Sequence, residues 1–424
     1  MIKKIVKHVS GGLKGEIEVP ADKSISHRAV MLASLANGKT VIKNFSRGKD
    51  PLSSLNICKV LGVSAEFQDN NLIIKSTGNL IAPKSFLYCG NSGTTMRFMS
   101  GILAGQNFDS CLVGDNSLSK RPMKRIIEPL KLMGANIVSN ECRAPLKIFG
   151  QKLFGINYSS KLSSAQVKSC ILLAGLFAEG KTVYSEPYVS RNHTERMLKL
   201  MGADINADGT SITISPSKLI PKSIEICGDI SSAAYFIVAA LVVPDSEIIL
   251  RNVGLNPTRD GILEVVKKMG GNIQILDKKI VSGEEVGDLK ISYSELHACT
   301  IEGEIIPKLI DELPVIAVLA SQADGVTIVK DASDLRNKES DRISAIVSEL
   351  WKLGADIDET QDGFIIKGKN KLKGGCEVES YNDHRLAMSL YVAGLVCENQ
   401  IQINGFEWVS ISFPEFEKLF SSIY

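Results

Sequence analysis

The chain repeats an eight-residue stretch, LKLMGANI at 130–137, as LKLMGADI at 198–205 and, in variant form, as VKKMGGNI at 266–273 and LWKLGADI at 350–357. Each copy is typical of the end of an amphipathic helix, a Gly that stops the helix, and the start of a strand. The copies recur about every 70 residues, and repeats of this kind define an architecture before any other signal. The chain of 424 residues has room for six such units.

Six other stretches share a second plan, in which a short alternating strand leads through a polar turn into a helix. They are GEIEVPADKSISHR (15–28), SFLYCGNSGTTMR (85–97), GINYSSKLSSAQ (155–166), SIEICGDISSA (223–233), CTIEGEIIPKLIDE (299–312) and CEVESYNDHR (376–385). Together the two features predict six units and an α/β fold class. Either the sheets lie outside buried helices or the reverse, and the repeat period is compatible with both.

The two ends of the chain indicate how the units are grouped. The sixth unit ends in its helix at Tyr424 and lacks the strands that should follow, whereas residues 5–20 carry such strands. We therefore expect one domain of three units over 21–227 and a second over 1–20 plus 228–424, because single cores rarely exceed about 250–300 residues. A solenoid, the alternative, does not need its N-terminus to finish its last unit.

Composition excludes several classes of protein. The net charge is +2 with 23% charged residues, so there is no basic excess of the kind that binds nucleic acid. The nine cysteines are scattered without a CxxC pair, which favours a reducing, cytoplasmic location. The longest apolar run, AAYFIVAALVV at 233–243, is too short to cross a membrane. We expect a monomer with no nucleic-acid or membrane partner.

One motif match is interpreted as a false positive. GLFAEGKT at 175–182 fits the phosphate-loop pattern GxxxxGK[ST]. A true phosphate loop follows a strand and opens a helix, whereas here a helical pattern precedes and a strand pattern follows. We predict a helix-to-strand turn. The five histidines show no metal-ligand spacing.

Cations at the predicted helix starts indicate an anionic ligand. Ser, Thr, Asp and Asn in these turns are explained by helix capping, and we expect the turn DISSA, beginning at Asp229, to be mainly a cap. Lys23, Arg28 and Arg385 are harder to explain, because a cation at a helix N-terminus opposes the helix dipole. A bound anion would offset that cost.

The starts of the second helices carry arginines as well. Arg121, Arg191 and Arg342 are suited to bidentate binding of carboxylate or phosphate. For Arg259 and Arg336 we expect only solvated, charged helix faces. The combined pattern predicts a cleft between two similar domains that closes on small, highly anionic substrates.

Eight motifs in register identify a family that the chain resembles, from about Gly12 to Phe416. They are DKSISHR, GNSGTTMR, SKRPMK, SAQVKS, DELPVIAV, LRNKESDR, YNDHRLAMS and SFPEF. In this order they closely resemble 5-enolpyruvylshikimate-3-phosphate synthases, and SAQVKS with SRNHTE is similar to the bacterial subgroup called class II. The resemblance implies a two-domain inside-out α/β barrel of six βαβαββ repeats, three per domain, with the chain crossing twice.

The resemblance also implies a reaction, in which the 5-hydroxyl of shikimate 3-phosphate attacks phosphoenolpyruvate and phosphate leaves. This is a transferase step of the shikimate pathway, which supplies chorismate and the aromatic amino acids, and it is the target of glyphosate. The two substrates carry roughly five to six negative charges. No metal or organic cofactor is implied.

Site residues are carried over from the family motifs position by position. For shikimate 3-phosphate the resemblance implies Lys23, Ser24, Arg28, Ser164, Gln166, Arg191, Asp311 and Lys338. For phosphoenolpyruvate it implies Lys23, Gly93, Arg121, Gln166, Arg342 and Arg385, with Glu339 beside the methylene.

We predict an addition–elimination mechanism through a tetrahedral intermediate. Asp311 takes the proton of the 5-hydroxyl and is kept ionised by the helix N-terminus that follows it. Either Glu339 or Lys23 protonates the methylene carbon of phosphoenolpyruvate. The arginines and Lys23 stabilise the charge of the intermediate and of the departing phosphate.

Two positions depart from the family pattern, and two other functions are alternatives. Ile411 stands where many relatives have Lys, and Ala165 replaces a serine of one subgroup. The sister enzyme UDP-N-acetylglucosamine enolpyruvyl transferase typically has a cysteine in the loop that corresponds to GDNSLSKRP at 114–122, which has none. A non-catalytic module that binds anions or RNA ends is opposed by the paired acids Asp311 and Glu339.

Overall fold

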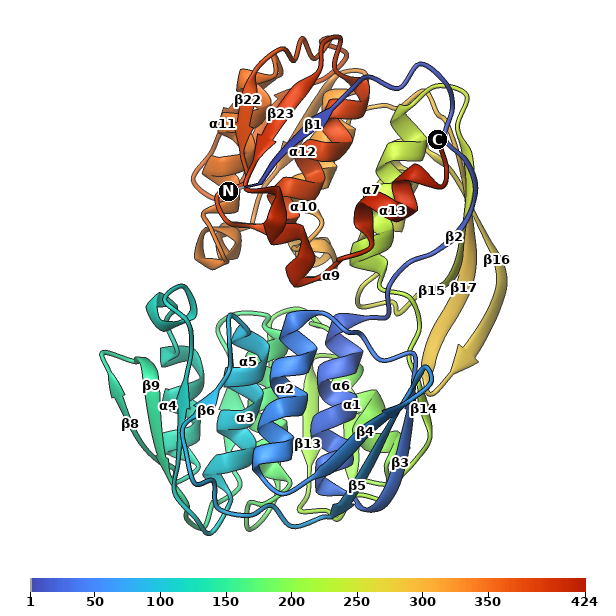
Figure 1. The fold of residues 1–424 in the computed structure, drawn as a ribbon. Helices are drawn as coiled ribbons and strands as arrows, with labels where there is room; N and C mark the ends of the chain where they lie inside the picture. Colours follow the sequence, from blue (N-terminus) through green and yellow to red (C-terminus); the bar gives the residue numbers. More distant parts are fainter. Residues whose placement is uncertain (1) are drawn as a thin grey trace. The chain divides into compact units, whose positions relative to one another are not determined.

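The computed structural model, which describes residues 2–424, divides into two compact units (Figure 1). Unit 2 comprises Ala21–Ile226 together with the short segment Ile280–Glu284. Unit 1 comprises the described residues up to Pro20, Cys227–Lys279 and Glu285–Tyr424. Each unit contains three sheets.

Unit 2 is built from three copies of one plan. Its strands are β3 (Asn37–Lys43), β4 (Ser64–Gln68), β5 (Asn71–Thr77), β6 (Leu87–Tyr88), β7 (Ser110–Val113), β8 (Asn136–Asn140), β9 (Arg143–Phe149), β10 (Asn157–Ser159), β11 (Thr182–Ser185), β12 (Ile205–Asp208), β13 (Ser211–Ile214) and β14 (Ile224–Glu225). Its helices are α1 (Lys23–Leu35), α2 (Lys49–Val60), α3 (Gly93–Ala104), η1 (Leu118–Lys120), α4 (Lys124–Leu132), α5 (Ala165–Gly175) and α6 (His193–Leu200).

The three sheets of unit 2 have the same strand order. They read β14-β3-β5-β4, β6-β7-β9-β8 and β10-β11-β13-β12. In each sheet the first two strands are parallel and the remaining neighbours are antiparallel. In the second and third sheets a helix connects the two parallel strands. Thr182 begins β11 and Gly175 ends α5, so the phosphate-loop pattern is a helix-to-strand turn, as predicted.

The helices of unit 2 lie inside its sheets, which decides between the two arrangements left open by the sequence. Eleven residues of α1, ten of α3 and nine of α5 are buried. Figure 1 shows these helices side by side, with β3, β4 and β5 on one outer side and β8 and β9 on another. Burial on all faces explains why the second halves of these helices, AVMLASL, FMSGILA and CILLAG, consist of apolar or small residues rather than of amphipathic stripes.

Unit 1 follows the same plan with additional short turns. Its strands are β1 (Lys3–Val6), β2 (Lys14–Glu18), β15 (Glu247–Gly254), β16 (Asn272–Val281), β17 (Glu284–Ser292), β18 (Thr300–Ile301), β19 (Val326–Val329), β20 (Asp356–Glu359), β21 (Phe364–Lys367), β22 (Glu377–Glu379) and β23 (Ile401–Asn404), the tip of the β16–β17 hairpin being counted with unit 2. Its helices are α7 (Ile230–Val242), α8 (Gly261–Lys268), η2 (Gly303–Ile305), α9 (Ile306–Leu309), α10 (Leu313–Ser321), η3 (Ser333–Asn337), α11 (Arg342–Lys352), α12 (His384–Val396), η4 (Phe406–Ile411) and α13 (Phe416–Ser421).

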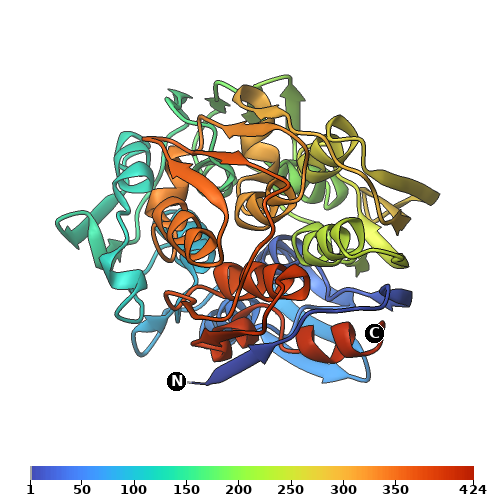
Figure 2. The same ribbon diagram turned by 90° about the horizontal axis from the view of Figure 1, so that it is seen from above.

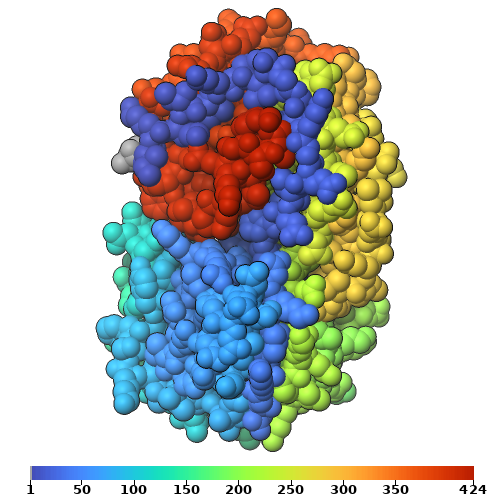
Figure 3. All heavy atoms as spheres, turned by 45° about the vertical axis from the view of Figure 1, so that its right-hand side comes forward, coloured from blue at the N-terminus to red at the C-terminus, as the bar shows by residue number. Residues whose placement is uncertain are grey.

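The N-terminal strands β1 and β2 pair with strands of unit 1. The sheets read β2-β15-β17-β16, β18-β19-β21-β20 and β22-β23-β1. In the last of these, β1 pairs antiparallel with β23, so it replaces the strand that the sixth unit lacks. Figures 2 and 3 show the N-terminal residues (blue) alongside the C-terminal residues (red) of the same unit.

The core of unit 1 is formed by α7, α10 and α12, which pack against one another. All thirteen residues of α7 and all nine of α10 are buried. The end of the chain packs onto this core through aromatic rings, with Phe420 stacked on Phe236 at 4.2 Å between centroids. Phe416 contacts Tyr391 edge-on at 5.2 Å. The terminal SFPEF motif therefore carries at least one core residue.

The repeated stretch first seen at 130–137 is a helix C-terminus in every copy. After α4 and α6 the chain turns at Gly134 and Gly202, with φ of 93° and 84°. A side chain is strained in this left-handed region, so the repeat requires glycine there. Equivalent glycines follow α8 and α11 at Gly270 and Gly354, with φ of 78° and 99°. The signature is thus architectural.

Candidate active site

Several of the polar turn residues are helix caps, as predicted. Asp22, Ser92, Asp229 and Asp383 accept hydrogen bonds of 2.7–3.1 Å from backbone N–H groups in the first turns of α1, α3, α7 and α12. These side chains satisfy donors that the helix itself leaves without partners. In the described chain, Ser164 precedes α5 without making such a side-chain cap.

Arg28 lies on α1 inside unit 2 and is only 3% exposed. Its guanidinium donates to Thr194 Oγ1 at 2.6 Å, to Ser169 Oγ at 2.9 Å and to the carbonyl of Ser24 at 2.9 Å. All three acceptors are uncharged. Burial lowers the pKa of Arg28 to about 10, and the nearby charge of Glu195 opposes this only in part.

The start of α1 places two further cations or potential cations beside Arg28. Lys23 Nζ lies 3.3 Å from Asp50 Oδ2, and both side chains are largely buried. His27 is fully buried, and its Nδ1 lies 2.7 Å from Ser54 Oγ. Burial, followed by the charges of Lys23 and Arg28, keeps the pKa of His27 well below its ordinary value. The imidazole therefore remains neutral beside the two cations.

The starts of α3 and α5 are joined by a short network. Arg97 Nη1 donates to Gln166 Oε1 at 2.6 Å, and Gln166 Nε2 donates to Thr94 Oγ1 at 3.0 Å. A Cβ on Gly93 would lie 2.6 Å from Arg97 Nη1, so the absence of a side chain leaves this space to the guanidinium. The sequence placed Gly93 and Gln166 in the site but assigned no substrate to Arg97.

Two other predicted residues of unit 2 lie on loops. Arg121 follows η1 and donates through Nη2 to Asn91 Oδ1 at 2.6 Å. Arg191 is half-buried in the loop between β11 and α6, directly after the buried Ser190. Both positions are at the start of the second helix of a repeat, as the sequence indicated.

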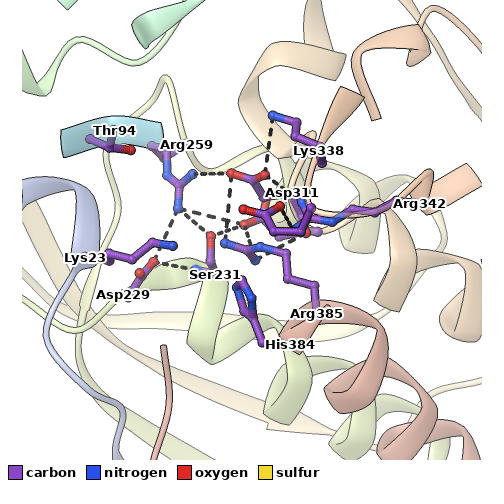
Figure 4. A network of polar contacts seen from close by, with 12 residues as sticks. Lys23, Thr94, Asp229, Ser231, Arg259, Asp311, Lys338, Arg342, His384 and Arg385 are labelled. Carbon is purple, nitrogen blue, oxygen red and sulfur yellow. Dashed lines mark hydrogen bonds and ion pairs between the residues drawn. The ribbon is translucent and has the colours of Figure 1, made fainter. Parts of the chain in front are cut away.

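In unit 1, Asp311 is surrounded by cations (Figure 4). Its carboxylate oxygens lie 3.2 Å from Arg342 Nη1, 3.7 Å from Lys338 Nζ, 3.9 Å from Arg385 Nη2 and 4.0 Å from Arg259 Nη1. Four cationic side chains from three repeats thus contact one acid. The structure brings together the predicted residues Asp311, Lys338, Glu339, Arg342 and Arg385 in this network.

Arg342 is the centre of the network and is 1% exposed. Beside Asp311, it contacts Glu339 Oε2 at 2.6 Å and Asp383 Oδ2 at 2.7 Å. Burial acts to lower the pKa of Arg342, but the charges of Asp383, Glu339 and Asp311 outweigh it and raise the pKa. The pKa of Asp383 lies below its ordinary value. Burial acts to raise this pKa, but the charge of Arg342 and its other partners outweigh burial.

The expectation that Arg259 lies on a solvated helix face is wrong. Arg259 is 2% exposed, and its Nη2 lies 2.5 Å from Ser231 Oγ and 3.3 Å from Asp229 Oδ1. It also approaches Glu312 Oε1 at 3.8 Å, and Glu312 accepts a short hydrogen bond from Ser231. The local stretch NPTRDG is polar and gives no sign of this burial, because the residues that surround Arg259 come from other parts of the chain.

Asp229 is therefore more than a cap, since it also pairs with Arg259. Arg336, the other arginine expected on a solvated face, is half-buried and contacts Asp341 and Glu359 at 2.9 and 2.8 Å. Ile411 is buried at the end of η4.

Among residues 2–424 no group of three or more His, Cys, Asp or Glu side chains could hold a metal ion. No helix of the described chain is long and apolar enough to span a membrane.

Comparison with known proteins gives the same assignment at the level of family. The profile of the family described as EPSP synthase (3-phosphoshikimate 1-carboxyvinyltransferase) matches residues 8–420. A curated 3-phosphoshikimate 1-carboxyvinyltransferase from Thermoanaerobacter sp. (strain X514) is 52% identical over 414 residues, which cover 97% of this chain and 98% of the relative. One from Bacillus licheniformis is 49% identical, covering 95% and 96%.

Solved structures are similar over nearly the whole chain. An EPSP synthase from Acinetobacter baumannii has a TM-score of 0.89 at 42% identity, covering 99% of this chain and 98% of that one. The enolpyruvyl transferase NikO from Streptomyces tendae has a TM-score of 0.79 at 15% identity, covering 99% and 97%. The second likeness concerns the fold alone.

Proposed function

The chain belongs to the EPSP synthase family, the 3-phosphoshikimate 1-carboxyvinyltransferases, and from this premise we propose how its own residues carry out the reaction. It is a transferase that moves the enolpyruvyl group of phosphoenolpyruvate to the 5-hydroxyl of shikimate 3-phosphate and releases phosphate. The observation that carries this function is the full-length match at 52% identity. The fold is the two-domain inside-out α/β barrel that the resemblance implied.

We assign the two substrates to the residues given by the family motifs. Shikimate 3-phosphate is bound by Lys23, Ser24, Arg28, Ser164, Gln166, Arg191, Asp311 and Lys338. Phosphoenolpyruvate is bound by Lys23, Gly93, Arg121, Gln166, Arg342 and Arg385. The buried Arg28 supports the first assignment, because its hydrogen bonds to uncharged oxygens leave its charge to be balanced by an anion.

Asp311 is the proposed base for the 5-hydroxyl proton, and its cationic surroundings support this role. The sequence attributed its ionisation to the following helix, and four cationic side chains within 4.0 Å also favour the ionised form. Arg342 contacts both Asp311 and Glu339. A substrate anion that binds Arg342 exchanges with these carboxylates and releases them for proton transfer. Glu339 or Lys23 then protonates the methylene carbon.

The tetrahedral intermediate is stabilised by the cations that bind its oxygens, and electrostatic stabilisation of this kind is usually the largest catalytic contribution. Arg385 is suited to this role because it stays cationic. Burial acts to lower its pKa, but the charges of its neighbours, Asp311 first among them, outweigh burial and raise the pKa. We place the reaction in the cytoplasm, since all nine cysteines are free thiols, and we expect a monomer.

One assay tests the function. The protein is mixed with phosphoenolpyruvate and shikimate 3-phosphate, and phosphate release is measured. We expect release only when both are present. Release with UDP-N-acetylglucosamine in place of shikimate 3-phosphate would overturn the assignment, although the absence of cysteine at 114–122 speaks against this alternative.

A further inference from the structure

A fully buried lysine lies one turn behind the proposed substrate residues of α5. Lys168 is 0% exposed, and its ammonium group contacts three oxygens. These are Glu186 Oε1 at 2.9 Å, Glu195 Oε1 at 2.8 Å and the carbonyl of Ser190 at 2.8 Å. The three N–H donors of an ammonium group are thereby satisfied. From the motifs alone, Lys168 has no role beyond its place in SAQVKS.

The acids that hold Lys168 also hold the chain on both sides of Arg191. Glu186 Oε1 accepts from Ser190 N at 2.8 Å, and both carboxylate oxygens lie within 2.9 Å of Ser190 Oγ. On the other side of Arg191, Glu195 lies in the first turn of α6. Lys168 therefore joins the residue before Arg191 to the helix that begins two residues after it.

The same segment contacts Arg28. Thr194 accepts from Arg28 Nε at 2.6 Å and lies 2.6 Å from Ser169 Oγ, and Ser169 is the neighbour of Lys168 in the chain. Arg28 and Arg191, both assigned to shikimate 3-phosphate, are thus fixed through one buried polar cluster. In that cluster, Lys168 is the cation that binds the two glutamates.

Stability alone does not account for this cluster. A buried ion pair is often no more stabilising than apolar side chains of similar volume, because its desolvation penalty offsets the attraction. Two glutamates would also repel a substrate phosphate, and Lys168 reduces their combined charge from −2 to −1. Fixing the position of a charged loop is a role that apolar packing would fulfil less well.

We propose that Lys168 is a positioning residue for the phosphate of shikimate 3-phosphate, acting through Glu186, Ser190 and Glu195 on Arg191. The inference rests on the proposed function. It adds to that function the residue that sets the geometry of the phosphate-binding loop. Lys168 is itself assigned to neither substrate. Phosphoenolpyruvate is assigned to neither Arg28 nor Arg191 and shares only Lys23 and Gln166 with shikimate 3-phosphate, so we expect its binding to depend far less on Lys168.

The test is the variant K168M, with KM measured separately for each substrate. We expect KM for shikimate 3-phosphate to rise about tenfold or more, the size expected when a hydrogen bond of a charged group is lost. KM for phosphoenolpyruvate stays unchanged and kcat changes little. An unchanged KM for shikimate 3-phosphate in folded K168M, or an equal rise for both substrates, overturns the proposal.

A second variant separates position from charge and decides the question if K168M fails to fold. E186M removes a negative charge, so electrostatics alone predict tighter binding of shikimate 3-phosphate, whereas loss of the anchored loop predicts weaker binding. We expect weaker binding, and tighter or unchanged binding overturns the proposal. Wild-type protein that releases no phosphate refutes the proposed function instead.

The matched control is E349M in unit 1. Glu349 is also 0% exposed, pairs with Lys352 at 2.8 Å and accepts from the backbone N–H of Glu379 at 3.0 Å. Its loss removes a buried carboxylate that contacts none of the assigned substrate residues, although its lysine partner is more exposed than Lys168. We expect E349M to lower the melting temperature but to leave KM for shikimate 3-phosphate at the wild-type value.

Discussion

Arg28 in unit 2 and Arg342 in unit 1 are equally buried, at 3% and 1% exposure, but their surroundings are opposite. Arg28 donates to two hydroxyls and a carbonyl, and its pKa is lowered. Arg342 contacts three carboxylates, and its pKa is raised. Burial acts in the same direction on both, so the difference lies in the partners.

The difference supports the two ways of binding an anion that we propose. In the first, an anion at Arg28 adds a counter-charge that the protein does not supply through its hydrogen bonds. In the second, an anion at Arg342 takes the place of a carboxylate, which then becomes available for proton transfer. The first arrangement suits a phosphate that only has to be held, and the second suits the substrate whose atoms react.

The largest expected effect is that of R342M, which removes the centre of the unit 1 network. Asp383 would remain buried without its ionic partner, and breaking a buried pair in this way costs about 3–5 kcal/mol of the free energy of unfolding. Denaturant unfolding measures this loss, and phosphate release measures the activity, which we expect to be abolished.

R336M is the matched control for this variant. Arg336 lies in the same unit, but it is half-buried and its acids Asp341 and Glu359 are about 40% exposed. Pairs as exposed as these contribute about 0–1 kcal/mol. An equal loss of stability in R342M and R336M would mean that the burial of Arg342 does not matter.

D311N is expected to have the second largest effect. The variant keeps the shape of the side chain and removes the base, and general-base catalysis contributes typically about 10²–10⁴-fold to the rate. We expect kcat to fall within that range while KM for phosphoenolpyruvate changes far less. Full turnover in D311N would show that another group takes the 5-hydroxyl proton.

Much of the fold could be predicted from the sequence because the decisive signals are local. The helix end, its glycine in the left-handed region and the following strand are contiguous in the chain, so four copies of this signature could be recognised without tertiary information. The substrate residues came mainly from the family motifs, and the unusual cations Lys23, Arg28 and Arg385 gave independent support. The arrangement of sheets outside helices required the structure.

Arg259 and Lys168 could not be predicted, because their partners are distant in the sequence. Arg259 is buried by Asp229 and Glu312, which belong to the starts of two other helices. Lys168 is held by acids 18 and 27 positions further along the chain. A single sequence shows each of them only as one charge in a polar stretch or an apolar helix.

R28M is expected to show the opposite pattern to R342M, with a small effect on stability and a larger one on binding. Thr194 and Ser169 remain hydrogen-bonded to each other at 2.6 Å, so no hydroxyl loses its last partner. Losing a hydrogen bond of a charged group costs about 1.5–3 kcal/mol, which corresponds to about 10- to 150-fold in affinity. We expect KM for shikimate 3-phosphate to rise by that factor. A collapse in stability as large as that of R342M would contradict the comparison.

The smallest expected effect is a change in the pH dependence of stability in H27Q. The pKa of His27 in the folded protein lies well below its ordinary value of 6.5, so below pH 6.5 the unfolded chain binds a proton that the folded chain does not. Stability is therefore lost as pH falls, by at most about 1.4 kcal/mol per pH unit. A glutamine side chain at this position can keep a hydrogen bond to Ser54 and does not titrate, so H27Q should lose less stability than wild type between pH 7 and pH 5.5.

Denaturant unfolding at the two pH values measures this difference, and H8Q is the control because His8 is exposed. If H27Q and H8Q show the same pH dependence as wild type, His27 titrates normally in the folded protein. Such a result would contradict both the effect of burial on the imidazole and the excess positive charge of Lys23 and Arg28, which distinguishes the surroundings of Arg28 from those of Arg342.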